Sequence, residues 1–326
     1  MINNKLVTVC IATYNRSETV CCLVQELLDF ELNDQIEILV IDDCSPDNTY
    51  EDLSQFSHHQ NVTILKNDTN LSRARTQLRY FNICKTEYLI ELPDDELLYK
   101  EGLLELLLLL PTLDVDFLST RWMDTTGLFY GGRGSDDIQE ISLTNLRIQS
   151  EHSIGCVFRA SILKLSEEEI VKRLEQGCAA AFFYHQNIVL LIAKLNNLKL
   201  LSSSILLGGY RPEGPLIGQF TDAQGNCYTS LSAAFNKYLG MKSLYEDSLM
   251  KFSDTQFADE LAALSASHTL SIYSVVEDAL GYNNDSESTT LVTNLQAGSV
   301  RNFMNPIKAL RHLLKFITVK FTAWKY

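Results

Sequence analysis

Three acidic side chains follow the apolar run Tyr88–Leu92 directly: Asp94, Asp95 and Glu96, in the segment PDDE. Neighbouring carboxylates repel one another unless a cation or solvent compensates their charge. Hard divalent cations such as Mg²⁺ and Mn²⁺ bind carboxylate oxygens, which makes the segment a candidate metal site. A solvated turn that starts the next helix explains the same residues, because acids favour helix N-termini. The segment alone leaves both interpretations open.

Signals for strands and helices alternate through residues 1–122. The run IEILVI is continuously apolar, as expected for a parallel strand that is covered on both faces. Strands are predicted at Leu6–Ala12, Ile36–Ile41, Val62–Leu65 and Tyr88–Leu92. Helices are predicted at Ser17–Leu28, from Asp47 and Asn48 onward, at Ser72–Cys84 and at Gly102–Leu110. This alternation predicts an α/β fold with an open, mostly parallel, Rossmann-like sheet and flanking helices.

Beyond residue 122 the patterns are weaker. Residues 124–150 are polar and contain glycine, and they are predicted to form a loop or flap. Ser166–Glu175 and Phe183–Asn196 are predicted helices, Lys199–Leu207 a strand and residues 208–215 a Gly/Pro loop.

We expect a catalytic domain at residues 1–215, divided near residue 122 into a nucleotide-binding half and an acceptor half (123–215). A helical region (216–300) and a basic amphipathic helix (301–326) complete the predicted organisation.

Polar clusters follow each of the first four predicted strands. They are TYNRS at 13–17, DDCSPDN at 42–48, KNDTN at 66–70 and PDDE at 93–96. Open α/β sheets bind their ligands beyond the carboxyl ends of the strands. Four such loops at one edge favour a functional site over an ordinary acidic turn.

The combined motifs resemble those of the family 2 glycosyltransferases of GT-A fold. The resemblance rests on ATYNR (12–16), IDDCSPDNT (41–49), NLSRAR (70–75) and PDDE (93–96). A looser resemblance links SIGCVFRASIL (153–163), FFYHQN (182–187) and LLGGYRP (206–212) to bacterial O-antigen enzymes of the abequosyltransferase kind. The family resemblance implies an inverting enzyme that takes a sugar from a nucleotide-sugar. The looser resemblance implies that the acceptor is a lipid-linked oligosaccharide of surface polysaccharide (O-antigen or capsule) biosynthesis.

The resemblance also implies roles for individual residues. Thr13 and Tyr14 match residues that line the nucleotide base, and Asp43 matches the aspartate that hydrogen-bonds it. Asn67 and Arg75 match positions near the nucleotide and the diphosphate, where a guanidinium suits phosphate oxygens. The full set of predicted donor-binding residues is Thr13, Tyr14, Asn15, Asp42, Asp43, Asn67, Arg75, Asp94 and Arg211. For Arg211, an ordinary surface position is the alternative.

The expected cofactor is Mg²⁺ or Mn²⁺. Asp94 matches the second acid of the family's Asp-x-Asp metal motif, and Asp95 is expected to assist it as a ligand. Leu92 stands where the family usually has the first acid. Because diphosphate oxygens and waters can complete the coordination, one protein carboxylate can suffice for such an ion.

His185 occupies the place of the aspartate that removes the acceptor proton in many relatives. An imidazole suits this task, since its unperturbed pKa of about 6.5 lies near neutral pH. The alternative is a packed core histidine beside Phe182, Phe183 and Tyr184. Glu151 is a second candidate base, and His152 a candidate contact to the acceptor.

The charge distribution bears on partners and localisation. The net charge is −14, yet residues 301–326 contain six of the 27 Lys and Arg residues and no acid. An acidic body disfavours nucleic acid, whereas a basic amphipathic tail suits an anionic membrane surface. Packing of the tail on the acidic body, or on another copy, explains the same pattern. We therefore expect a cytoplasmic protein held peripherally on the inner membrane by this helix.

The cysteines and the apolar segments agree with a cytoplasmic location. The eight cysteines form no CxxC pair, which favours a reducing compartment. The N-terminal apolar run is too short for a signal peptide, and the run LLELLLLL at 103–110 is too short to cross a bilayer.

Two other classes of protein remain as alternatives. A non-catalytic relative that binds nucleotide-sugar or acts as a scaffold would explain Leu92 and His185. A nucleotidyltransferase or a signalling receiver would use the acidic pair Asp42–Asp43. A signalling receiver is disfavoured because it needs its acidic pair after the first strand. A nucleotidyltransferase is disfavoured because it usually needs a Gly-rich, basic triphosphate loop near the N-terminus, which TYNRS resembles poorly.

Overall fold

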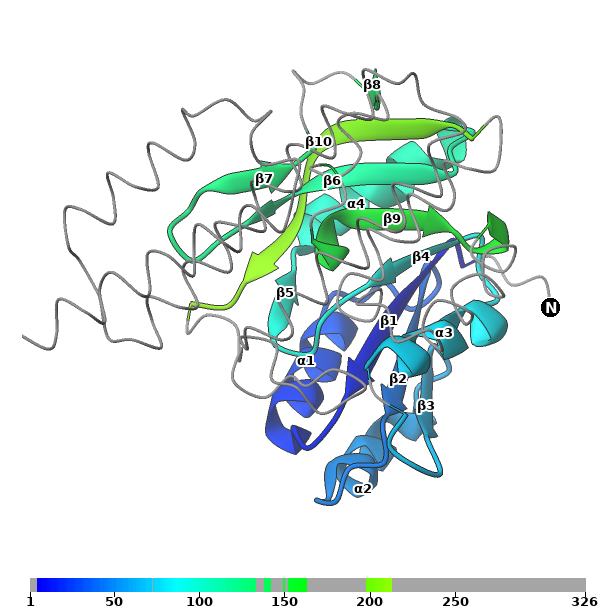
Figure 1. Cartoon of the computed structure of the whole chain (residues 1–326), viewed down its shortest axis with the longest axis vertical. Helices are drawn as coiled ribbons and strands as arrows, with labels where there is room; N and C mark the ends of the chain where they lie inside the picture. The colour runs from blue at the N-terminus through cyan, green and yellow to red at the C-terminus, as the bar shows by residue number, and fades with distance from the viewer. Residues whose placement is uncertain are drawn as a thin grey trace, which may run out of the picture. The chain divides into compact units, whose positions relative to one another are not determined.

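The computed structural model describes residues 5–71, 73–132, 138–141, 149, 152–162 and 198–212, which all lie in the compact unit formed by residues 1–223. Within these residues the chain forms one ten-stranded sheet (Figure 1). The strands are β1 (Val7–Thr13), β2 (Ile36–Asp42), β3 (Val62–Lys66), β4 (Tyr88–Glu91), β5 (Glu96–Leu98), β6 (Phe117–Met123), β7 (Phe129–Gly131), β8 (Gln139–Glu140), β9 (Cys156–Arg159) and β10 (Leu200–Tyr210). The helices are α1 (Ser17–Leu28), α2 (Thr49–Leu53), α3 (Arg73–Ile83) and α4 (Lys100–Leu109), with short 3₁₀ turns at Ser54–His58, Leu110–Thr112 and Ser153–Gly155.

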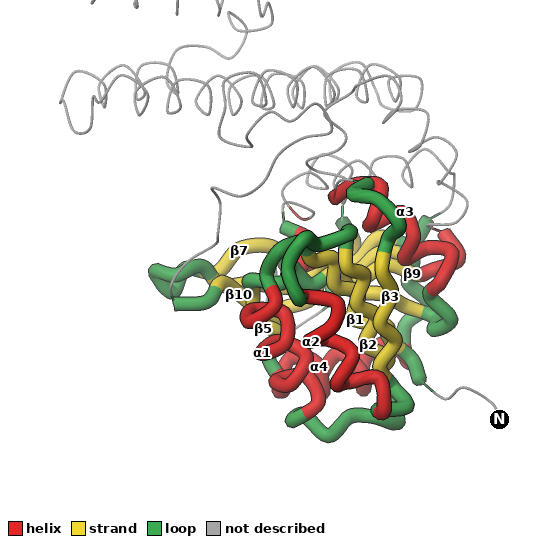
Figure 2. Tube along the Cα trace, turned by 90° about the horizontal axis from the view of Figure 1, so that it is seen from below, coloured by secondary structure: helices red, strands yellow, loops and turns green. Residues whose placement is uncertain are grey.

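The strand order is β3-β2-β1-β4-β9-β6-β10-β5, with β7 paired to β6 and β8 to β10. The first four strands are parallel to one another, whereas β9 runs antiparallel to both β4 and β6. Figure 2 shows α1, α2 and α4 on one face of the sheet and α3 on the other. The predicted mostly parallel α/β sheet with flanking helices is confirmed.

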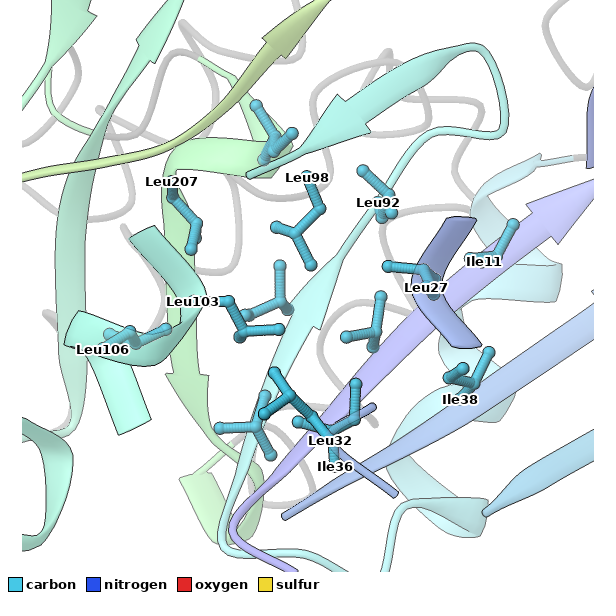
Figure 3. Close-up of a cluster of buried hydrophobic side chains, with 14 of the residues drawn as sticks. Ile11, Leu27, Leu32, Ile36, Ile38, Leu92, Leu98, Leu103, Leu106 and Leu207 are labelled. Carbon is cyan, nitrogen blue, oxygen red and sulfur yellow. The ribbon is translucent and has the colours of Figure 1, made fainter. Parts of the chain in front are cut away.

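A cluster of buried aliphatic side chains joins the sheet to its helices (Figure 3). Ile11 and Ile38 come from neighbouring parallel strands, and Leu27 covers them from α1. Leu92 and Leu98, which flank the acidic segment, are buried in the same cluster. The backbone on either side of Asp94–Glu96 is therefore anchored in the core.

The structure differs from the sequence-based expectations at three places. Gly208 and Gly209 belong to β10 and not to a loop. Glycine is needed there because the neighbouring backbone is close. A Cβ on Gly208 would lie 2.2 Å from the Leu97 carbonyl oxygen, and a Cβ on Gly209 would lie 2.4 Å from the Met123 carbonyl oxygen. The alternative of an acidic turn that starts the next helix does not describe Glu96, which begins the short strand β5 and pairs with Tyr210 of β10. In the predicted 124–150 loop, Phe129–Gly131 forms β7.

Several predictions fall on other parts of the chain. The helices at 166–175 and 183–196, the domain boundaries at 215 and 300, and the amphipathic tail lie outside the described residues. In the portion that is described, no helix combines the length and apolarity required to traverse a bilayer.

Candidate functional site

A pocket of about 330 Å³ lies where β1 and β4 end. It is lined by Ala12, Thr13, Tyr14, Asn15, Arg16, Asp43, Thr76, Gln77, Glu91, Leu92, Pro93 and Asp94. The loops after β1, β2 and β4 thus converge at the carboxyl edge of the parallel strands, as their order in the sheet requires. Tyr14 is 45% exposed, so one large aromatic side chain remains accessible at the pocket.

Hydrogen bonds join the loops after β1 and β2. The backbone N–H of Asn15 donates to Ser45 Oγ at 2.8 Å, and the Ser45 hydroxyl and N–H both donate to the Asp42 carboxylate. Asn15 and Cys44 have φ values of 56° and 61°, a left-handed conformation that is uncommon outside glycine and is concentrated at functional sites. Asp42 thus lies behind the pocket, where burial raises the pKa of its carboxyl against the opposing effect of the Ser45 hydrogen bonds.

Asp43 is held in place from the loop after β3. Its Oδ1 accepts hydrogen bonds from Asn67 Nδ2 at 2.6 Å and from the Leu71 backbone N–H at 2.8 Å. Asn67 also donates to Thr76 Oγ1 at 2.8 Å and accepts a hydrogen bond from Arg79. Asp43 is therefore fixed at the wall of the pocket, and Asn67 supports it from behind.

Asp94 is buried between two donors. Thr13 Oγ1 donates to its Oδ2 at 2.8 Å, and Arg16 Nη1 donates to its Oδ1 at 2.6 Å. The same guanidinium nitrogen lies 3.4 Å from Asp95 Oδ2. Burial raises the pKa of Asp94, and the adjacent Arg16 partly opposes that shift.

The carboxylates of this segment do not fit a divalent cation in the observed arrangement. Both oxygens of Asp94 already accept hydrogen bonds, and Arg16 lies between Asp94 and Asp95. Leu92, at the place of the first acid, is fully buried and supplies no ligand. Across the described ranges, no group of three or more His, Cys, Asp or Glu side chains is arranged to hold a metal ion.

A second pair joins the buried Glu96, one residue further along, to the partly buried His152. Glu96 Oε1 is 3.1 Å from His152 Nε2, while Glu96 Oε2 and His152 Nδ1 are buried without a hydrogen-bond partner. The His152 ring contacts the rings of Trp122 and Tyr210, with centroids 4.5 and 5.3 Å away. His152 thus belongs to an aromatic cluster beside the acidic segment, and it does not line the pocket.

The predicted site residues divide into four groups. Thr13, Tyr14, Asn15, Asp43 and Asp94 line the pocket. Asn67 and Asp95 contact residues that line it, and Asp42 supports Asn15 through Ser45. Arg75 is exposed on α3 and does not line the pocket. Arg211 pairs with Glu26 of α1 at 3.0 and 2.8 Å and does not line it either. His185 and Glu151 lie outside the described residues.

Sequence reasoning missed several residues of the site. Arg16, Thr76, Gln77 and Glu91 all line the pocket, and Gln77 donates a hydrogen bond to Glu91. Arg79 of α3 donates a hydrogen bond to Asn67, which supports Asp43. Arg16 lies within the TYNRS motif, so the motif placed it near the strand ends but did not indicate its contact with Asp94.

The parallel sheet, with its polar pocket and acidic segment at the carboxyl edge, defines the chain as an α/β protein of GT-A type. It belongs to glycosyl transferase family 2, whose family model matches residues 8–172, just over half of the chain. The predicted family and the predicted glycosyltransferase class are therefore confirmed. This assignment rejects the nucleotidyltransferase and signalling-receiver alternatives. The likeness to abequosyltransferases stays a prediction.

Solved structures agree with the fold. The chain is similar to S. aureus TarS 1-349, with a TM-score of 0.56 and 14% identity over 94% of this chain and 91% of that one. The complex of TarS 1-349 with UDP gives a TM-score of 0.55 at 15% identity, covering 94% and 91% of the two chains. The complex with UDP-GlcNAc gives 0.53 at 17%, covering 94% and 92%. At these identities the likeness concerns the fold alone. No curated protein sequence matches the chain.

Proposed function

We propose that this protein is an inverting glycosyltransferase that moves a sugar from a nucleotide-sugar to a lipid-linked oligosaccharide of bacterial surface polysaccharide biosynthesis. The observation that carries the proposal is the pocket at the ends of β1 and β4, in which Tyr14 and Asp43 lie on converging loops. The fold likeness to TarS, which has been solved with UDP and with UDP-GlcNAc, supports a nucleotide-sugar donor.

Tyr14 and Asp43 supply the two contacts that a nucleobase needs. The half-exposed ring of Tyr14 offers an aromatic face on which a base can stack. Both hydrogen bonds to Asp43 end on Oδ1, which leaves Oδ2 to accept a hydrogen bond from a base N–H. Because Asn67 and the Leu71 N–H fix the carboxylate beforehand, little ordering remains to be done on binding.

Transfer requires a base for the acceptor hydroxyl and positive charge near the departing diphosphate. His185 is the proposed base, which follows from its place in the family pattern. Among the described residues, Arg16 is a cationic side chain that lines the pocket. Inversion and the O-antigen or capsule pathway rest on the resemblance alone, which does not assign the sugar.

The basic helix at residues 301–326 is proposed to hold the enzyme on the cytoplasmic face of the inner membrane, where a lipid-linked acceptor is presented. The test is sedimentation with vesicles that contain anionic lipid, comparing the full chain with a chain that ends at residue 300. Only the full chain is expected to sediment with the vesicles. Equal sedimentation of both chains would contradict the role of the tail.

The donor is tested by thermal unfolding with a panel of nucleoside diphosphates and nucleotide-sugars. One nucleotide class is expected to raise the midpoint of unfolding, since a ligand that binds only the folded state stabilises it. The corresponding nucleotide-sugar is then supplied with a lipid-linked acceptor, and transfer is followed by mass spectrometry. Binding of nucleotide-sugars without transfer to any acceptor would favour the non-catalytic relative.

A further inference from the structure

The guanidinium of Arg16 is buried in the place where the expected metal ion would bind. The Arg16 side chain is 5% exposed, and the side chains of Asp94 and Asp95 are 6% and 5% exposed. One guanidinium nitrogen lies 2.6 Å from Asp94 Oδ1 and 3.4 Å from Asp95 Oδ2. Arg16 therefore compensates the charge of both neighbouring carboxylates from inside the protein.

A divalent cation would compete for the same oxygens. Mg²⁺ binds carboxylate oxygens at about 2.0–2.1 Å, so an ion on Asp94 Oδ1 would lie close to the guanidinium of Arg16, and the two positive charges would repel each other. The other oxygen of Asp94 is engaged by Thr13 at 2.8 Å. Leu92 offers no further ligand, because it is an apolar side chain packed in the core (Figure 3).

Arg16 also supplies positive charge to the pocket that it lines. A guanidinium stays protonated at all physiological pH values, and its planar fork can serve carboxylate and phosphate groups together. Arg16 immediately precedes α1, which begins at Ser17, and the N-terminal end of a helix carries a partial positive charge. The positive charge that a diphosphate needs is thus built into the loop after β1.

We propose that Arg16 takes the place of the divalent cation at this site, so that the pocket binds the diphosphate of a nucleotide without a metal ion. This inference rests on the proposed function, because it assumes a nucleotide donor. It differs from what the family pattern implies, since the acidic segment serves here to hold an arginine.

The test is calorimetric titration of the full, metal-stripped chain with UDP and with GDP, in EDTA and in Mn²⁺. For the wild type, the Kd of the nucleotide that binds is expected to change less than about twofold between the two conditions. Arg16→Gln is expected to weaken binding in EDTA by roughly tenfold or more, as the loss of a charged hydrogen bond predicts. Mn²⁺ should restore part of that loss, because the variant removes the competing positive charge from beside Asp94 and Asp95.

Electron paramagnetic resonance of Mn²⁺ without nucleotide gives an independent readout. The wild type is expected to bind Mn²⁺ weakly, Arg16→Gln more tightly, and the double variant Arg16→Gln/Asp94→Asn weakly again. Arg16→Lys keeps the charge but not the fork, and it should retain more UDP or GDP affinity in EDTA than Arg16→Gln does. Arg159→Gln, which removes a part-buried arginine from a network with Glu87 and Asp114, is the control and should leave nucleotide binding unchanged.

The outcomes separate the inference from the proposed function. A wild-type Kd that falls tenfold or more on adding Mn²⁺ overturns the role of Arg16 and leaves the glycosyltransferase intact. A folded Arg16→Gln variant that binds UDP or GDP in EDTA as the wild type does overturns it as well. Absence of nucleotide binding by the wild type in both conditions overturns the proposed donor site and this inference together.

Discussion

Thr13 Oγ1 donates a hydrogen bond of 2.8 Å to Asp94 Oδ2, which ties the end of β1 to the segment that follows β4. Both residues are buried, at 3% and 4% exposure, and both line the pocket. A buried hydroxyl and a buried carboxylate are costly unless each finds a partner, so this bond fixes the two loops relative to each other. The TYNRS and PDDE motifs therefore act as one structural unit.

Tyr14→Ala is expected to weaken nucleotide binding, because the ring is the exposed aromatic surface at the pocket. Stacking of a base on an aromatic ring contributes about 1–3 kcal/mol, and that contribution should be lost. Calorimetric titration with the nucleotide that stabilises the wild type measures it. Tyr14→Phe keeps the ring and serves as the control. A Tyr14→Ala variant with wild-type affinity would contradict base stacking at this position.

Asp43→Ala is expected to reduce both stability and nucleotide affinity. It leaves the buried Asn67 amide and the Leu71 N–H without their acceptor, which costs about 1–3 kcal/mol of unfolding free energy. Urea denaturation measures the loss of stability, and calorimetric titration measures the nucleotide affinity. Asp68→Ala removes the same charge from an exposed position nearby and should change neither. Unchanged affinity in a folded Asp43→Ala variant would remove Asp43 from the donor site.

His185→Ala is expected to lower the rate of sugar transfer by about 10²–10⁴-fold, since a general base contributes on this order. Donor affinity should stay within about twofold of the wild type, because a base acts on the acceptor. Steady-state transfer assays and calorimetric titration with the donor measure the two effects separately. Full activity would show that the histidine is a packed core residue, and Glu151→Gln is then the next variant.

Gly102→Ala is expected to destabilise the fold although alanine favours helices. A Cβ on Gly102 would lie 2.0 Å from the carbonyl oxygen of Leu206, so α4 would have to move away from β10. Overpacking of this kind costs about 1–3 kcal/mol, more than the helix propensity of alanine returns. Guanidinium denaturation measures the change. Glu105→Ala on the exposed side of α4 is the control and should lie within about 0.5 kcal/mol of the wild type.

Alkylation of the cysteines should follow their burial. Burial raises the pKa of Cys10 and of Cys156 well above the usual thiol value of 9.0, so both stay protonated and unreactive at about pH 8. Cys22 is exposed and is expected to react. Iodoacetamide treatment followed by peptide mass spectrometry measures the labelling, and denatured protein is the control. Labelling of Cys10 in the native protein at the rate of Cys22 would contradict the burial of β1.

The long strands were predictable because their own residues specify them. Ile36–Asp42 is apolar nearly throughout, and a strand covered on both faces needs no other signal. The strand β5 was missed because Glu96 resembles a turn residue, and it adopts a strand only by pairing with Tyr210 far along the chain. Short strands of this kind depend on partners that a local pattern does not contain.

The position of the site was predictable from the sequence, but not all of its side chains were. The rule that ligands lie at the carboxyl ends of parallel strands placed Tyr14, Asp43 and Asp94 together. That rule does not indicate which side of α3 faces the pocket. Arg75 was predicted from the family pattern, whereas Thr76 and Gln77 line the pocket. The bond from Arg16 to Asp94 joins positions far apart in sequence, and no local pattern indicates it.

The sheet order has a consequence for how the chain folds during synthesis. In the described part of the sheet, β5 pairs with β10 alone, through contacts such as Leu98 with Gly208. The parallel strands β1 to β4 can pair as soon as residue 91 has left the ribosome, whereas β5 must wait for residues 208–210. Non-local pairings of this kind form slowly, so the backbone after Asp95 reaches its final place late. A nascent chain that ends before residue 208 lacks the partner strand of β5.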